Sequence, residues 1–322
     1  RPSPNWLSKM NSNTFTQLLK ESFKSNDTEE WLDVHFTRPI GLVFALMWNR
    51  LGIHPNVITV ISIFLGAAAG WFFHYTDLSD NLLAVGLLML ANFCDSTDGQ
   101  MARLSNKRTL LGRALDGFSG DVWFLCIYIA LAVRLSDQNI PGLDAQWGWL
   151  AWVLCLVAGL LCHSPQSSLA DYYRQIHLYF LKGKEGSELD NAAAQQAHHD
   201  ALPRNDWFGR LFYSNYGSYC KSQERRTPKF QRFFSIWTAG KGTSAQRAAV
   251  REDLLSCSRP LMPFTNILTF NTRAIVLYVG ALLNVVWIYP AFEIIVMTFL
   301  YLYMHKTHEA MCERLTQQLE EI

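Results

Sequence analysis

Two aspartates three positions apart, Asp95 and Asp98, lie in a run of small and polar residues, CDSTDGQMAR. At about 100° per residue, positions 95, 98, 99 and 102 fall on one face of a helix. Gly99 and Ala102 carry little or no side chain and would leave this face open to a ligand. A third aspartate, Asp116, follows a short basic turn and begins the next apolar segment. We therefore expect three carboxylates to converge where two antiparallel helices meet.

Three carboxylates at one point repel one another strongly unless a cation neutralises them. Hard oxygen ligands of this kind favour Mg²⁺ or Mn²⁺. Two such ions can polarise a diphosphate and stabilise the leaving oxygen in a displacement at phosphorus. A single aspartate at a helix end is more often a cap or a solvated residue, but three at this spacing between apolar segments predict a functional metal site.

The segments that must position these aspartates are apolar. Charged residues make up 17% of the chain, against roughly 25% in typical soluble domains. Six segments are candidates for membrane spans, and three of them, at 12 or 13 residues, are far shorter than the roughly 20 residues that a bilayer requires. The six are Val57–Phe73, Leu82–Phe93, Val122–Val133, Trp147–Cys162, Ala274–Tyr289 and Ala291–Tyr303. The short ones reach full length only if the polar residues beside them are also helical and face a protein interior or a wet cavity.

The remaining segments complete an expected all-α fold, a polytopic membrane protein with six transmembrane helices and an N-terminal interfacial helix. Ile40–Trp48 is apolar but too short to span a bilayer, and suits a helix in the membrane interface. Leu178–Thr272 is polar and lacks strand alternation, which predicts a mostly helical insert. The expected divisions are 1–54 (polar segment and interfacial helix), 55–177 (four spans and the motif), 178–272 (insert) and 273–322 (two spans and tail).

Composition and charge narrow the function further. The net charge of +1 and the lack of a dominant basic block argue against a nucleic-acid partner. The 7 cysteines show no metal or disulfide spacing and are interpreted as reduced thiols without a catalytic part. Lysines and arginines, including Lys107 and Arg108, lie on one side of the predicted spans. The positive-inside rule therefore predicts that the active site, the insert and both termini face the cytoplasm.

The motif Asp-x2-Asp-Gly-x2-Ala-Arg-x8-Gly-x3-Asp resembles the signature of the CDP-alcohol phosphotransferases, also called CDP-alcohol phosphatidyltransferases. The matching residues are Asp95, Asp98, Gly99, Ala102, Arg103, Gly112 and Asp116. The start of the first predicted span, Pro55–Asn56–Val–Ile–Thr59, is similar to a second pattern of the family. The family also typically shows an interfacial helix before this span, and together these features cover about residues 35–135.

The resemblance implies a role for each matching position. The implied ligands of two divalent cations, Mg²⁺ or Mn²⁺, are Asp95, Asp98 and Asp116. The residues implied to line a CDP pocket are Gly99, Ala102, Arg103 and Gly112, with Asn56 and Thr59 as weaker candidates.

One position departs from the family pattern, which continues Asp-x3-Asp and uses the final aspartate as the general base. Position 120 is a glycine here, and the next carboxylate is Asp121. A straight helix would turn this side chain about 100° away. Gly117 and Gly120 would allow a one-residue π-bulge, a feature often found at functional sites. We predict that such a bulge makes Asp121 the general base and a further metal ligand. In the alternative, Asp121 caps the helix or faces solvent, and the base is lost or supplied elsewhere.

The activity implied by the resemblance is that of an enzyme, a CDP-alcohol phosphotransferase of phospholipid biosynthesis. Our first prediction is transfer of a phosphatidyl group from CDP-diacylglycerol to a polar alcohol, such as inositol or inositol phosphate, with release of CMP. The second is transfer of phosphocholine or phosphoethanolamine from a CDP-alcohol to a lipid hydroxyl of diacylglycerol or ceramide. The third is a non-catalytic metal-binding membrane protein or transporter. Expected partners are the CDP-linked donor, the alcohol acceptor, membrane lipids and a second copy of the chain in a homodimer.

Two weaker polar clusters are candidates for holding the acceptor alcohol or its phosphate. One is Asp171–His177, and the other comprises Asn266, Asn271, Thr272 and Arg273. In the alternative, both are solvated helix ends. The aromatic and basic run Trp207–Trp237 is interpreted as an interfacial or packed helix.

Overall fold

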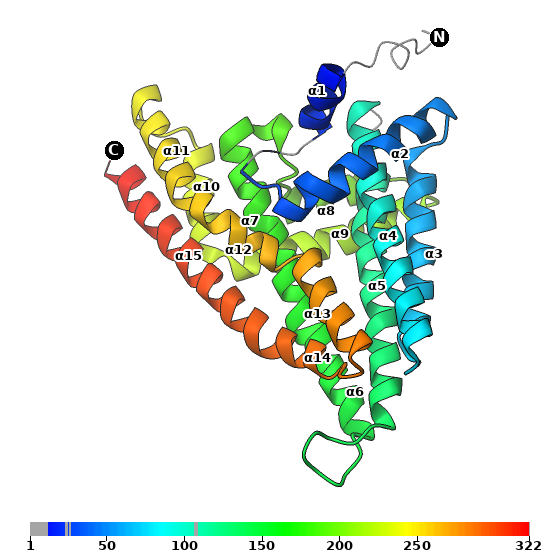
Figure 1. The fold of residues 1–322 in the computed structure, drawn as a ribbon. Helices are drawn as coiled ribbons and strands as arrows, with labels where there is room; N and C mark the ends of the chain where they lie inside the picture. Colours follow the sequence, from blue (N-terminus) through cyan, green and yellow to red (C-terminus); the bar gives the residue numbers. More distant parts are fainter. Residues whose placement is uncertain (1–11, 23–24, 26, 106–108, 322) are drawn as a thin grey trace. The chain divides into compact units, whose positions relative to one another are not determined.

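A computed structural model describes residues 12–22, 25, 27–105 and 109–321 of the chain (Figure 1). Within these ranges the protein is 82% helical and forms no strand, which confirms the all-α prediction. The chain divides into two compact units. Unit 1 comprises Arg1–Leu161 and Arg273–Ile294, and unit 2 comprises Cys162–Thr272 and Ile295–Ile322. The predicted basic residues Lys107 and Arg108 lie outside the described residues.

Unit 1 contains the predicted motif and most of the apolar segments. Its helices are α1 (Ser12–Ser22), a π-helical segment (Asp33–Thr37), α2 (Arg38–Arg50), α3 (Pro55–Phe72), α4 (Leu78–Leu104), α5 (Leu110–Ser136), α6 (Trp149–Leu156), most of α13 (Phe270–Leu282) and α14 (Ile288–Phe292). The predicted interfacial segment falls on α2, which runs crosswise to α4 (Figure 1). The place of α2 in a membrane interface stays a prediction.

The polar stretches that carry the three aspartates are helical, as the short spans required. α4 continues from its apolar part through Asp95 and Arg103 to Leu104. α5 begins before Asp116, where the side chain of its N-cap Thr109 accepts a hydrogen bond of 2.9 Å from the backbone N of Gly112. The prediction that the polar stretches extend the spans is therefore confirmed.

Five helical stretches of the described residues are long and apolar enough to cross a membrane. They are Pro55–Phe72, Leu78–Leu104, Ala114–Ser136, Trp149–Lys182 and Ile288–Glu320. The protein is therefore an integral membrane protein. The predicted span Ala274–Tyr289 falls mainly on α13, whose 13 residues are too few for a crossing, so that the count of six stays a prediction.

Glycines let α3 and α5 approach closely within unit 1. A Cβ atom added to Gly66 would lie 2.0 Å from Cδ1 of Trp123, and one added to Gly70 would lie 2.5 Å from Cβ of Cys126. Both distances are far below van der Waals contact, so no other residue fits at either position without a shift of the helices. Small residues one turn apart are a common device for close helix packing in membranes.

A buried arginine fixes the other end of these helices. Arg134 is 3% exposed, and its Nη1 donates to the backbone O of Phe73 at 3.1 Å and to Oδ1 of Asn81 at 2.8 Å. Its Nη2 donates to Oδ1 of Asn284 at 2.7 Å. The guanidinium thus joins the ends of α3, α4 and α5 to the turn after α13. It lies 18 residues along α5 from Asp116, a distance of about 27 Å at 1.5 Å per residue.

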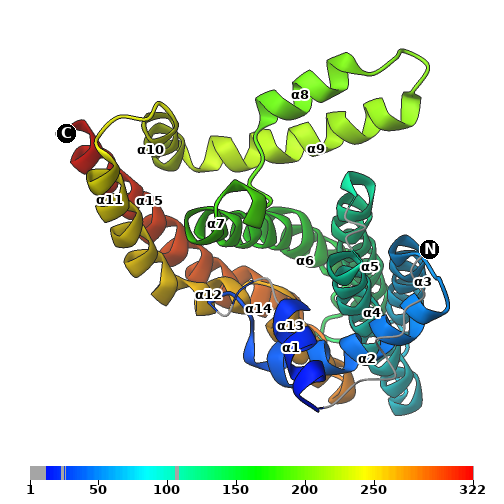
Figure 2. The ribbon, with the colours of Figure 1, turned by 90° about the horizontal axis from the view of Figure 1, so that it is seen from above.

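Unit 2 contains the whole predicted insert, which is mostly helical as expected. Its helices are α7 (Ser164–Lys182), α8 (Ala192–Ala201), α9 (Trp207–Arg226), α10 (Pro228–Thr238), α11 (Ser244–Ser258), α12 (Met262–Ile267) and α15 (Thr298–Glu320), with short 3₁₀ turns at Lys184–Gly186 and Arg259–Leu261. Figure 2 shows α8 and α9 as an antiparallel hairpin.

The aromatic and basic run of the insert divides between α9 and α10. In α10, Phe230 and Phe233 are fully buried, and Glu309 of α15 accepts a hydrogen bond of 2.9 Å from the backbone N of Lys229. This contact satisfies a backbone donor at the start of α10 and confirms that this part of the run is a packed helix. The first turn of α9, in contrast, exposes Trp207 and Phe208.

Candidate metal and active site

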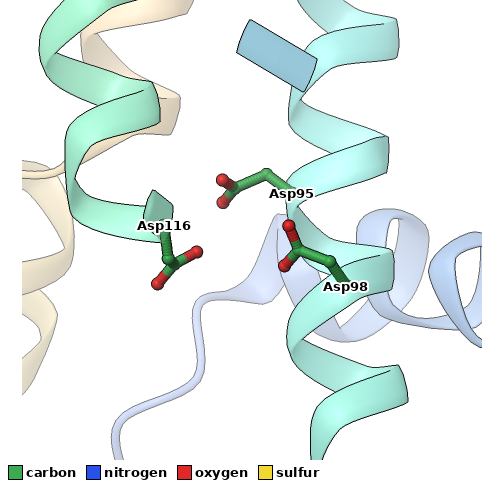
Figure 3. A group of neighbouring side chains, drawn as sticks. All are labelled: Asp95, Asp98 and Asp116. Carbon is green, nitrogen blue, oxygen red and sulfur yellow. The ribbon is translucent and has the colours of Figure 1, made fainter. Parts of the chain in front are cut away.

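The three aspartates of the motif meet between α4 and α5. Asp95 and Asp98 project from α4, Asp116 projects from α5, and their carboxylates point toward one another (Figure 3). One oxygen from each carboxylate lies within 4.8 Å of the others. Among the described residues, no other set of three or more His, Cys, Asp or Glu side chains has such geometry. The predicted convergence is therefore confirmed, while the role of the three as metal ligands stays a prediction.

Burial within the group falls from one aspartate to the next. Asp98 is 4% exposed, Asp95 is half-buried and Asp116 is exposed. The group is therefore closed at Asp98 and open at Asp116, from which an ion or a phosphate can approach. Three converging carboxylate oxygens fit a hard divalent cation such as Mg²⁺ or Mn²⁺, because these ions prefer oxygen ligands. The residues present thus fit the cofactor that the motif implies.

Hydroxyl groups hold two of the three carboxylates. Oγ1 of Thr59 on α3 donates to Oδ2 of Asp98 at 2.5 Å. Oγ of Ser119 on α5 donates to Oδ1 of Asp95 at 3.0 Å. Sequence reasoning placed Thr59 in the nucleotide pocket and missed Ser119 altogether. Ser119 could have been identified from its position one helical turn after Asp116, because this spacing puts both residues on one face of α5.

The residues predicted to line a CDP pocket lie around the carboxylates. A Cβ atom added to Gly112 would lie 3.1 Å from Oδ1 of Asn56, which brings the start of α3 against the first turn of α5. One added to Gly99 would lie 3.3 Å from Nη1 of Arg103. Ala102 lies on the same helix and is half-buried. The structure thus brings Asn56 to Gly112 and Arg103 to Gly99, and their binding of a nucleotide stays a prediction.

The predicted bulge around Asp121 is wrong. α5 is a regular α-helix from Leu110 to Ser136, without a π-helical turn. Asp121 is exposed and does not belong to the group of three carboxylates. A Cβ atom at Gly117 or Gly120 would meet nothing within 4 Å, so no neighbour forces the backbone out of the regular helix. The role of Asp121 as base and ligand lacks the geometry that motivated it and stays a prediction for mutagenesis.

The two weaker clusters meet in unit 2, where Nη2 of Arg174 donates to Oδ1 of Asn266 at 3.0 Å. His177 is fully buried, and its Nδ1 lies 2.7 Å from Oγ of Ser258, so it is a core residue. Arg273 belongs to unit 1 and forms a buried ion pair with Glu293. The interpretation of these segments as solvated helix ends is therefore wrong for His177 and Arg273.

Membrane-length helices that carry a converging group of carboxylates define an integral membrane protein with a candidate metal site. Residues 52–164 match the family described as CDP-alcohol phosphatidyltransferase. The match includes α3, α4 and α5 and therefore all three aspartates, which confirms the resemblance of the motif. The family is a transferase family that uses divalent metal ions.

A bacterial protein is also similar to part of this chain, but its description states no function. An uncharacterized protein of Aquifex aeolicus (strain VF5) is 39% identical over 69 residues. The alignment covers 21% of this chain and 34% of that protein, so the chain spans about a third of the length of this relative.

Proposed function

We propose that the protein transfers a phosphatidyl group from CDP-diacylglycerol to a small polar alcohol and releases CMP. The observation that carries this proposal is the group of Asp95, Asp98 and Asp116, which lies on membrane-length helices inside the segment that matches the family. Apolar helices around the site favour a lipid substrate, because a membrane-bound donor can reach the site without leaving the bilayer. Inositol and inositol phosphate are our first candidates for the acceptor.

The three carboxylates would hold two divalent cations, whose charge would neutralise the diphosphate of the donor and the oxygen of the departing CMP. Gly99 and Ala102 leave space beside the carboxylates for the nucleotide, and Arg103 supplies a positive charge. The acceptor hydroxyl oxygen attacks the β-phosphorus, and the bond from that phosphorus to the CMP oxygen breaks. The hydroxyl proton passes to a base, for which Asp121 is the predicted residue. The cytoplasmic orientation of the site and assembly as a homodimer are parts of the same proposal.

The experiment is a donor panel with protein purified in detergent or lipid nanodiscs. CDP-diacylglycerol, CDP-choline and CDP-ethanolamine are each supplied with Mg²⁺ or Mn²⁺ and with candidate acceptors, and both CMP and lipid products are measured. We expect CMP from CDP-diacylglycerol together with a new phosphatidyl lipid. Release of CMP only from CDP-choline or CDP-ethanolamine would replace this proposal with head-group transfer to a lipid hydroxyl. Absence of CMP with every donor would overturn the enzyme proposal.

A further inference from the structure

We propose that Ser119 is a positioning residue of the metal site and that its hydroxyl holds the carboxylate of Asp95 in the orientation that binds the cation. This inference rests on the proposed function, and it adds a residue that the family motif does not contain. Ser119 is 0% exposed. It therefore has no contact with solvent, and its hydroxyl must find its partners inside the protein.

The contacts of Ser119 connect the two helices that carry the aspartates. Its Oγ lies 3.0 Å from Oδ1 of Asp95 on α4 and 2.7 Å from the backbone O of Asp116 on α5. A hydroxyl has a single proton, so this proton is shared between the carboxylate and the carbonyl. The side chain therefore fixes Asp95 relative to the turn of α5 from which Asp116 projects.

The chemistry of the contact suits a metal site. A hydroxyl is neutral, so it orients a carboxylate without cancelling its negative charge, which remains available to a cation. An arginine or lysine in the same place would compete with the metal. Thr59 makes the corresponding contact with Asp98 from α3. Two ligands on α4 are thus held by hydroxyls from two different neighbouring helices, and outer groups of this kind typically change metal affinity or activity by about 10- to 100-fold when removed.

The direct test measures Mn²⁺ binding by isothermal titration calorimetry and by electron paramagnetic resonance on the purified full chain. Ser119→Ala removes the hydroxyl without adding any atom. We expect its Mn²⁺ affinity to fall by about 10- to 100-fold and the resonance of the bound ion to change. The matched control is Ser136→Ala on the same helix, because Oγ of Ser136 donates to the backbone O of Ala132 at 2.7 Å and to the backbone O of Gly148 at 3.2 Å, and neither acceptor is a carboxylate. This control should bind Mn²⁺ like the wild-type protein.

The outcomes separate this inference from the proposed function. If the wild-type protein binds Mn²⁺ and Ser119→Ala binds it equally well, the positioning role is wrong while the metal site stands. If the wild-type protein binds no Mn²⁺, the proposed function itself fails. An equal loss of affinity in Ser119→Ala and Ser136→Ala would show a general effect on α5 and would also overturn the inference.

Discussion

Thr59 and Asp98 are separated by 39 positions in the sequence, yet their side chains form a hydrogen bond of 2.5 Å between α3 and α4. Both residues are buried, at 2% and 4% exposure. The contact joins the threonine of the pattern Pro-Asn-x-x-Thr at the start of α3 to the aspartate motif on α4. Thr59 donates to the most buried of the three carboxylates. The sequence predicted Thr59 only as part of the lining of a nucleotide pocket.

Replacement of Thr59 by valine should weaken metal binding. The variant keeps the shape of the side chain but leaves the buried carboxylate of Asp98 without this donor, at a cost of about 1–3 kcal/mol. Thr97→Val is the matched control, because Thr97 is 1% exposed and its Oγ1 donates only to the backbone O of Phe93, at 2.7 Å. Calorimetry with Mn²⁺ should show a loss in Thr59→Val alone. Equal affinities in the two variants would contradict this role of Thr59.

Asp98→Asn should abolish CMP release and leave a folded protein. The change removes one negative charge from the centre of the group while keeping the volume of the side chain, and chelation by EDTA should have the same effect on the wild-type enzyme. Asp137→Asn is the control, since Asp137 is an exposed carboxylate at the end of α5. Substantial turnover by Asp98→Asn, or full activity in EDTA, would defeat the two-metal mechanism.

The identity of the base can be tested at positions 120 and 121. If Asp121 is the base, Asp121→Asn should lose turnover while it still binds the CDP donor, because a base acts on the acceptor alcohol. Adding Gly120→Asp to this variant should then restore activity. Position 120 lies four residues after Asp116 on the same helical face. A Cβ atom added to Gly120 would meet nothing within 4 Å, so the new side chain has space.

Gly117→Asp in the same Asp121→Asn background is the control for that rescue. A Cβ atom added to Gly117 would also meet nothing within 4 Å. Position 117 directly follows Asp116, however, and therefore points to a different face of α5. Rescue by both substitutions would show only an effect of added charge. Full turnover in Asp121→Asn would remove Asp121 from the mechanism. Substitution is a cleaner test than deletion of Gly120, because a deletion in a regular helix rotates Trp123 away from Gly66.

Arg134→Met should destabilise the protein without changing its metal affinity. The substitution leaves the backbone O of Phe73 and the buried Oδ1 of Asn81 without this donor, and each buried unsatisfied group costs about 1–3 kcal/mol. Thermal unfolding in detergent should show a clear decrease in Tm. Gln138→Ala is the control, since Gln138 is exposed and donates at 3.1 Å to Oδ1 of Asn284, the oxygen to which Arg134 also donates. A variant as stable as the control would contradict this role of Arg134.

The predicted orientation in the membrane implies that two exposed turns can be labelled only from opposite sides of the membrane. A cysteine at Lys241, in the turn between α10 and α11, should react only from the cytoplasmic side when the native cysteines are replaced. A cysteine at Thr76, in the turn between α3 and α4, should react only from the opposite side. Impermeable maleimides on intact and inverted vesicles provide the measurement. Reaction of both positions from one side would show that the positive-inside prediction is wrong.

The sequence predicted the parts of the fold that follow from local spacing. The separation of Asp95 and Asp98 and the apolar runs beside them were enough to predict that α4 and α5 continue through polar residues. Hydroxyl contacts were not predictable in the same way, because serine and threonine are ordinary in helices and their partners come from other helices. The bulge was predicted from the permissiveness of Gly117 and Gly120, but permissive residues bend a helix only where packing requires it, and a Cβ added at either position would meet nothing within 4 Å.

The close contact of α3 and α5 at Gly66 and Gly70 has a consequence for ion selectivity. Thr59 on α3 holds Asp98, and α5 carries Asp116, so the spacing of these helices also sets the spacing of the carboxylates. A bulkier residue at Gly66 would widen the interface with Trp123 and move Asp116 outward. Mg²⁺ requires near-ideal geometry at about 2.0–2.1 Å, whereas Ca²⁺ accepts longer and less regular distances. Under the proposed function, the preference of the site for a small ion would therefore depend partly on two glycines outside the group of carboxylates.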